Sequence, residues 1–273
     1  MTERTVPVPG GRLHVLDEGA GSPIVLLHAG IVDSRAWRPV TDRLVAAGYR
    51  TVAFDRRGAG ASVTDDVTFS NRDDVRAVMD ALGIDRACLV GNSAGGQIAV
   101  DVAVETPDRV VALVTVGASV GGHEPEPTPE EAALFDEMDR LEEAGAPDAV
   151  ADFDVRFWVD GPGQPETRVA PAIRDLVRAM TRSNGDPDRV TGRPVPLLPR
   201  AAERLDALTM PVLAVAGALD VSDVPATAEH LAAVVPGARA LILPDVAHLV
   251  GLEAPERLAA EIVALLALLA PWV

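Results

Sequence analysis

The chain has 273 residues, of which 48% are hydrophobic and 24% charged, a composition typical of a folded, enzyme-sized protein that excludes a disordered chain. Acidic residues outnumber basic ones by 41 to 24, and the net charge of -17 predicts a surface that repels nucleic acid and anionic membranes. No lysine is present, which excludes nucleotide chemistry based on a phosphate-binding loop of the Gly-Lys-Ser/Thr type.

Short apolar runs alternate with helical patterns through the first part of the chain. Residues 5–8 and 13–16, separated by Pro9-Gly10-Gly11, are typical of an antiparallel hairpin at a sheet edge. Three strand and helix pairs follow, at residues 23–28 and 34–48, 49–54 and 72–82, and 87–90 and 95–105. Further strands are predicted at residues 110–116, 212–216 and 239–243. This alternation favours right-handed crossovers and a mostly parallel sheet that is buried on both faces.

Residues 119–204 break the alternation. They carry helical patterns at 128–144, 148–159 and 170–182, separated by loops rich in proline and glycine, and no strand signal. We therefore predict a core made of residues 1–118 and 205–273, with residues 119–204 forming a helical cap over the carboxyl edge of the sheet.

Cysteine content and the ends of the chain indicate a cytoplasmic protein. Cys88 is the only cysteine, so neither an intramolecular disulfide nor a CxxC metal or redox motif can form. The N-terminus lacks the apolar segment of a secretory signal, and the apolar tract at 262–273 is too short to span a bilayer. We expect a monomer or homodimer. We also expect that the protein needs no metal or organic cofactor, because no ligand cluster of His, Cys and carboxylates is visible.

A nucleophile motif lies at the end of the predicted strand 87–90. Gly91-Asn92-Ser93-Ala94-Gly95 fits GxSxG and runs directly into a helical pattern, which is the context of a nucleophile elbow. The turn is too tight for side chains at its two outer positions, which explains the glycines there. Ser93 is the predicted nucleophile, and the amide of Ala94 is predicted to face the developing oxyanion.

An acid and a base follow in the order that this elbow requires. Asp220 comes directly after strand 212–216, and His248 follows strand 239–243. Loops at the carboxyl ends of parallel strands converge, so we expect Ser93, Asp220 and His248 to meet. Asp220 is preferred to Asp223 because it stands nearer the strand end. Gly30, just past strand 23–28, is the predicted second oxyanion donor.

The chain resembles the α/β-hydrolase fold family in four segments that span most of its length. They are His28-Ala29-Gly30, residues 55–62, the Ser93 elbow, and the segments around Asp220 and His248. The resemblance implies an α/β fold with a mostly parallel eight-stranded sheet, helices on both faces and a helical cap inserted after the sixth strand. Ala29 and Ala247 stand where the family usually has glycine, and both are small.

The segment after Asp55 is predicted to shape a turn and hold Arg56 or Arg57 in place rather than take part in chemistry. His28 adjoins the oxyanion loop, where it could touch substrate, although a structural hydrogen-bonding role is the commoner one in the family. Large apolar residues could line a pocket under the cap. Trp158 is the first candidate, and Phe157 and Trp37 are the next candidates. Others of this kind are Phe135, Met138, Phe153 and Met180.

These features predict a serine hydrolase that cleaves a carboxylic ester, lactone or thioester of a small organic molecule through an acyl-enzyme. Asn92 before the nucleophile is also similar to carbon–carbon bond hydrolases of ring-cleavage pathways, and the same triad serves cofactor-free perhydrolases and haloperoxidases. A small-ligand receptor on the same scaffold is the alternative outside catalysis.

Overall fold

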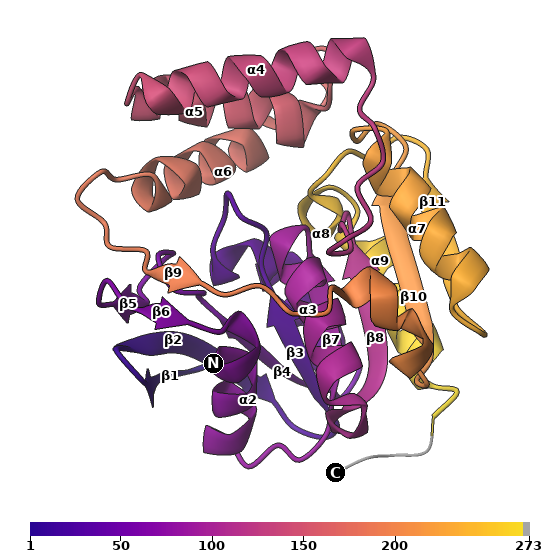
Figure 1. The fold of residues 1–273 in the computed structure, drawn as a ribbon. Helices are drawn as coiled ribbons and strands as arrows, with labels where there is room; N and C mark the ends of the chain where they lie inside the picture. The colour runs from indigo at the N-terminus through magenta and orange to yellow at the C-terminus, as the bar shows by residue number, and fades with distance from the viewer. Residues whose placement is uncertain (270–273) are drawn as a thin grey trace.

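The computed structural model describes residues 1–269 and is built around one mixed sheet (Figure 1). Along the sheet the order is β1 (Thr2–Val8), β2 (Gly11–Gly19), β4 (Arg50–Phe54), β3 (Pro23–Leu27), β7 (Ala87–Asn92), β8 (Val110–Val116), β10 (Val212–Gly217) and β11 (Arg239–Leu243). Strand β2 runs antiparallel to β1 and to β4, and the other neighbours are parallel. The short strand β5 (Val63–Thr64) pairs with β2. The predicted edge hairpin and mostly parallel eight-stranded sheet are confirmed.

Helices cover both faces of the sheet, which explains why its central strands are apolar throughout. Every residue of β3, β7, β8 and β10 is buried, as expected for parallel strands covered on both sides. One face carries α2 (Asn71–Ala81), α3 (Ala94–Glu105) and α7 (Asp223–Val234), and the other carries α1 (Arg38–Ala46) and α9 (Pro255–Leu266). Short helical turns complete the core: η1 (Ser34–Trp37), η2 (Pro107–Arg109) and α8 (Val250–Glu253).

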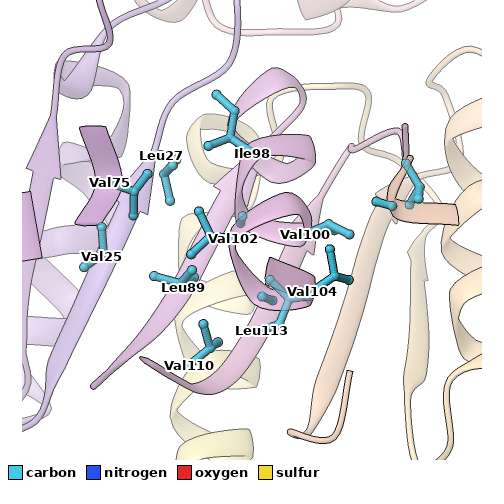
Figure 2. Packing of buried hydrophobic residues seen from close by; sticks show 14 of the residues in the cluster. Val25, Leu27, Val75, Leu89, Ile98, Val100, Val102, Val104, Val110 and Leu113 are labelled. Atoms are coloured by element: carbon cyan, nitrogen blue, oxygen red, sulfur yellow. The ribbon is translucent and has the colours of Figure 1, made fainter. Parts of the chain in front are cut away.

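Helix α3 begins directly after Ser93 and packs against the centre of the sheet. Its Ile98 and Val102 lie against Leu89 of β7 and neighbouring valines and leucines of β3 and β8 (Figure 2). Nine of its residues are buried, so the helix that begins at the Ser93 turn is anchored by apolar packing along most of its length.

The chain between β8 and β10 leaves the main sheet and forms helices above it (Figure 1). These are α4 (Pro129–Glu143), α5 (Pro147–Asp154), the π-helical segment η3 (Val155–Asp160) and α6 (Pro171–Asn184). The 3-10 segment η4 (Ala201–Ala207) follows them and lies beside α3 (Figure 1). Helix α4 begins with a capping box in which Thr128 and Glu131 bond each other's backbone amides. The helix expected over 148–159 is in fact divided into α5 and η3. A two-residue strand, β9 (Arg193–Pro194), pairs with β6 (Thr68–Phe69) where no strand was expected.

None of the helices within residues 1–269 combines the length and the apolar character that a bilayer span requires.

Candidate functional site

Ser93 lies in a strained turn between β7 and α3. It is the one residue other than glycine among residues 1–269 with a positive φ, at φ 53° and ψ -122°. Its N–H donates to Val116 O at 2.8 Å, and its carbonyl accepts from Gln97 N–H at 3.0 Å. The surrounding strand and helix hold this backbone in place, which is the usual setting for stored strain at a functional position.

The glycines around Ser93 allow three pieces of backbone to approach closely. A Cβ on Gly91 would lie 2.2 Å from Gly95 O, and one on Gly95 would lie 2.2 Å from Leu27 O. The first turn of α3 is therefore pressed against the end of β3, where the loop that carries Gly30 begins. The Ala94 N–H belongs to the first turn of α3 and has no acceptor within its own helix.

His248 and Asp220 form a buried hydrogen-bonded pair. His248 Nδ1 lies 2.7 Å from Asp220 Oδ2, and the two side chains are only 5% and 1% exposed. The second oxygen, Asp220 Oδ1, accepts from Val221 N–H at 2.8 Å. Because a carboxylate only accepts, Nδ1 carries the proton and Nε2 of a neutral imidazole is left as a base.

The backbone around His248 is tied to the residue next to Ser93. Asn92 Nδ2 donates to His248 O at 3.2 Å and to Val116 O at 2.9 Å. Glu253 Oε1 accepts from the N–H of Ala247 at 3.1 Å. None of the hydrogen bonds formed by residues 1–269 joins the Ser93 hydroxyl to His248, so this contact stays a prediction; in unliganded enzymes such contacts are often long.

The helical segment from α4 to α6, called the cap below, contacts the candidate site through Trp158. Its ring lies on the His248 ring with centroids 4.4 Å apart, and its carbonyl accepts from His248 N–H at 3.3 Å. Phe157 is 3% exposed and packs between Phe153 and Phe135 in an aromatic cluster. Trp158 therefore contacts the predicted base, whereas Phe157 belongs to the packing behind it.

His28 is a structural residue of the loop that leads to Gly30. It is fully buried, its Nδ1 donates to Ala29 O at 2.7 Å, and its Nε2 accepts from Arg56 N–H at 2.9 Å. Burial, reinforced by the charge of Arg56, lowers the pKa of His28 to about 4. A neutral ring with both nitrogens engaged shapes the loop before Gly30 and has no free atom for substrate.

Trp37 lies in the core rather than on a pocket wall. It is 3% exposed and packs against Gly251 and Val40 beside a void of only about 10 Å³. That void is too small for a substrate, so the predicted substrate contact of Trp37 finds no support in the structure.

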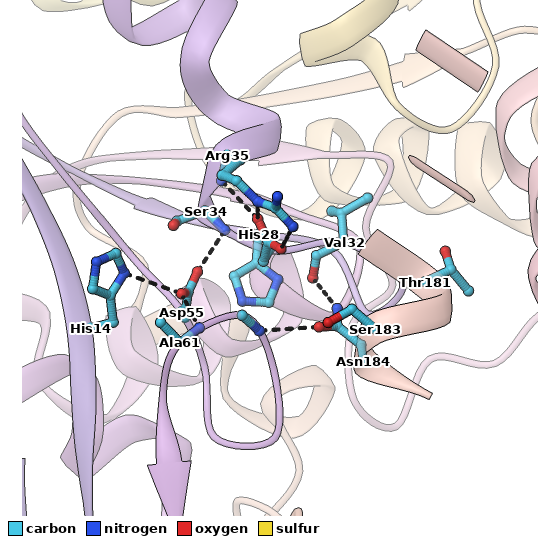
Figure 3. A network of polar contacts seen from close by, with 12 residues as sticks. His14, His28, Val32, Ser34, Arg35, Asp55, Ala61, Thr181, Ser183 and Asn184 are labelled. Atoms are coloured by element: carbon cyan, nitrogen blue, oxygen red, sulfur yellow. Dashed lines mark hydrogen bonds and ion pairs between the residues drawn. The ribbon is translucent and has the colours of Figure 1, made fainter. Parts of the chain in front are cut away.

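Asp55 shapes the turn that follows β4, as predicted. Its Oδ1 accepts from Ser34 N–H and its Oδ2 from Ala61 N–H, both at 2.8 Å (Figure 3). Arg57 is held by another carboxylate, that of Asp74, through two bonds of 2.7 and 2.8 Å.

A cavity with a volume of about 630 Å³ lies between core loops and cap helices. Gly30, Arg56 and Gly58 line it from the core, and Glu142 and Asp154 are among the residues that line it from the cap. Ser93, His248, Trp158 and Phe157 are not among its lining residues, whereas Gly30, the predicted oxyanion donor, is.

Asp154 is a lining residue that the sequence pattern does not reveal. It is 5% exposed, and its burial, together with the charge of Glu142, raises its pKa to about 7 against the opposing hydrogen bond of Trp158. Asp154 stands four residues before Trp158, whose ring contacts the ring of His248. It stands at the end of a helix, without any motif that could have identified it.

Comparison with known proteins agrees with this architecture. Rhodomycin D methylesterase DauP of Streptomyces sp. (strain C5) is 30% identical over 278 residues, which cover 91% of this chain and 92% of that protein. A 2-hydroxy-6-oxo-6-phenylhexa-2,4-dienoate hydrolase of Burkholderia cepacia is 38% identical over 113 residues, so the match spans only 40% of that relative's length and 39% of this chain.

Solved structures match over nearly the whole chain. The enol-lactonase from Burkholderia xenovorans LB400 has a TM-score of 0.78 at 21% identity and covers 97% of this chain and 100% of that one, which shows a shared fold. Est816, described as an N-acyl homoserine lactone degrading enzyme, has a TM-score of 0.71 at 27% identity, with 96% and 99% covered. The alpha/beta hydrolase family model matches residues 24–261, and the chain belongs to that family.

Proposed function

We propose that the chain is a serine hydrolase that cleaves a carboxylic ester, lactone or thioester, with Ser93 as nucleophile, His248 as general base and Asp220 as the residue that orients the base. The observation that carries the proposal is the buried 2.7 Å pair of His248 and Asp220, whose backbone is tied to Asn92 beside the strained Ser93. Strained nucleophile, base and orienting carboxylate are the three parts of an acyl-transfer site.

In the first half of the reaction, the Ser93 oxygen bonds to the carbonyl carbon while its proton passes to His248 Nε2. The amides of Gly30 and Ala94 stabilise the negative charge on the carbonyl oxygen. The bond to the leaving oxygen or sulfur then breaks, and His248 returns its proton to the leaving group. In the second half, His248 takes a proton from water, the hydroxide oxygen attacks the acyl carbon, and Ser93 leaves with the proton.

Methylesterase activity in a relative that matches 91% of this chain favours ester chemistry. Carbon–carbon bond hydrolysis is the second candidate, because relatives named as dienoate hydrolases match about two fifths of the chain and because Asn92 precedes the nucleophile. A substrate panel that contains short p-nitrophenyl esters, lactones and a 2-hydroxy-6-oxodienoate separates the two.

The test of the proposal is the Ser93→Ala variant. We expect its turnover of the best substrate to fall by about a million-fold if the triad acts as a unit. The exposed Ser183→Ala variant is the matched control and should keep full turnover. A fluorophosphonate should label the wild type once, at Ser93, as located by peptide mass spectrometry. Most activity retained in Ser93→Ala, or a label on another residue, would refute the assignment.

A further inference from the structure

Arg56 is a cation on the cavity wall without an anion beside it. Its Nη2 donates to Ala29 O at 3.3 Å, and its buried Nε has no hydrogen-bond partner. Among residues 1–269, no carboxylate lies within ion-pair distance of its guanidinium. The adjacent Arg57, in contrast, donates from Nε and Nη2 to the two carboxylate oxygens of Asp74. The charge of Arg57 is therefore neutralised by a carboxylate, whereas the charge of Arg56 is not.

An uncompensated guanidinium in this position is costly unless a ligand balances it. Burial lowers the pKa of Arg56 to about 10, which still leaves the group charged at neutral pH. A charge that is removed from water without a partner destabilises a protein, so such groups are normally paired. The planar fork of arginine matches a carboxylate with two parallel hydrogen bonds.

The cavity places this cation on the same wall as Gly30, the proposed oxyanion donor. Arg56 and Gly30 share the core wall, and the guanidinium bonds the carbonyl of Ala29, the residue before Gly30. The cap wall carries the carboxyl groups of Asp154 and Glu142 and no basic residue, so it offers an anion no cation on that side. A volume of about 630 Å³ suits a small organic molecule whose anionic group lies toward Arg56.

We propose that Arg56 binds a carboxylate of the substrate and makes the protein select esters or lactones that carry such a group over neutral ones. The proposal rests on the hydrolase function proposed above, since it names the substrate class of the same site. It assigns Arg56 a part in binding and specificity, not in the chemical steps.

The experiment compares two substrates, mono-p-nitrophenyl glutarate and the neutral p-nitrophenyl pentanoate, whose acyl chains have the same number of carbons. The ratio of their kcat/KM values is measured for wild type, Arg56→Met, Arg56→Lys and the control Arg12→Met. Arg12 is exposed and forms no ion pair with any described residue, so its loss removes one charge at a distance from the cavity.

We expect Arg56→Met to lower the ratio by about 10- to 100-fold, the size of a lost charge-assisted hydrogen-bonded pair, mainly through KM. Arg56→Lys should keep part of the preference, and Arg12→Met should keep all of it. A wild type that shows no preference for the glutarate ester, or a ratio that is the same in Arg56→Met and wild type, overturns the proposal.

A binding measurement separates failure of this proposal from failure of the hydrolase function. If wild type cleaves neither ester, the hydrolase proposal fails for these substrates, and calorimetric titration with glutarate then decides about Arg56. Glutarate that binds wild type about 10- to 100-fold more tightly than Arg56→Met supports the anion site. Equal affinities, or no binding to wild type, overturn it.

Discussion

The buried carboxyl of Asp154 should make the stability of the protein fall as pH rises. Asp154 is 5% exposed and ends α5 on the cavity wall. Burial is the largest cause that raises its pKa from 3.8 to about 7, the charge of Glu142 adds to it, and the hydrogen bond from Trp158 opposes it. In the unfolded chain the same group has its ordinary pKa.

The sign follows from the direction of this shift. A pKa that is higher in the folded state than in the unfolded state stabilises the fold at low pH, where both states are protonated. The contribution begins to decline above pH 4 and is lost once the pH has passed through about 7, where the folded state must also ionise. A shift of about three pKa units corresponds to at most about 4 kcal/mol.

The assay is urea unfolding followed by circular dichroism at several pH values from about 4 to 9. Asp154→Asn cannot ionise, so its free energy of unfolding relative to wild type should increase by up to about 4 kcal/mol across this range. The exposed Asp175→Asn on α6 is the control and should track wild type. Parallel curves for Asp154→Asn and wild type would show that the carboxyl is already ionised in the fold and refute the reasoning.

Two further variants test the role of the proposed acid and the backbone packing around Ser93. Asp220→Asn should lower kcat by about ten-thousand-fold through loss of the tautomer and orientation of the base, with Asp223→Asn as control; the reverse ranking would transfer the acid role to Asp223. Gly95→Ala should destabilise the fold by several kcal/mol, measured as the shift in unfolding midpoint, because its Cβ would lie 2.2 Å from the backbone oxygen of Leu27. Gly185→Ala, where the nearest contact is 3.3 Å, should change stability by about 1 kcal/mol or less, and equal shifts in the two variants would contradict this account.

The core was predictable because its signals are local. Strand β8 has the bounds that its apolar run predicts, since a parallel strand buried on both faces has no polar alternation to blur its ends. The edge strand β11 also has its predicted bounds, although most of its residues are only partly buried or exposed. The cap helices are amphipathic and were found to within a few residues. The π-helical turn η3 and the pairing of β9 with β6 were missed, because neither a single wide turn nor a two-residue strand has a periodicity to detect.

The candidate site likewise has a part that the sequence predicts and a part that it does not. The order of Ser93, Asp220 and His248 along the chain, combined with the rule that strand ends share one edge, was enough to predict the pair that the structure brings together. The cavity wall was not predictable, because Arg56 and Arg57 are adjacent and identical in type, and only the tertiary position of Asp74 decides which of them is neutralised.

Hydrogen bonds join the cap to two core loops, the one that follows Gly30 and the one that follows Arg56. These bonds connect the proposed substrate cavity with the proposed oxyanion donor. On α6, Thr181 donates to Ile31 O and Asn184 accepts from Gly60 N–H, each at 3.0 Å. Asn184 also donates to Val32 O at 3.0 Å (Figure 3). These bonds fix the loop after Gly30 and the turn that follows Arg56. A change in the cap therefore acts on the cavity directly and, through these hydrogen bonds, on the amide proposed to stabilise the oxyanion. For this reason the cap cannot be treated as a separate cover whose helices could be exchanged without cost to catalysis.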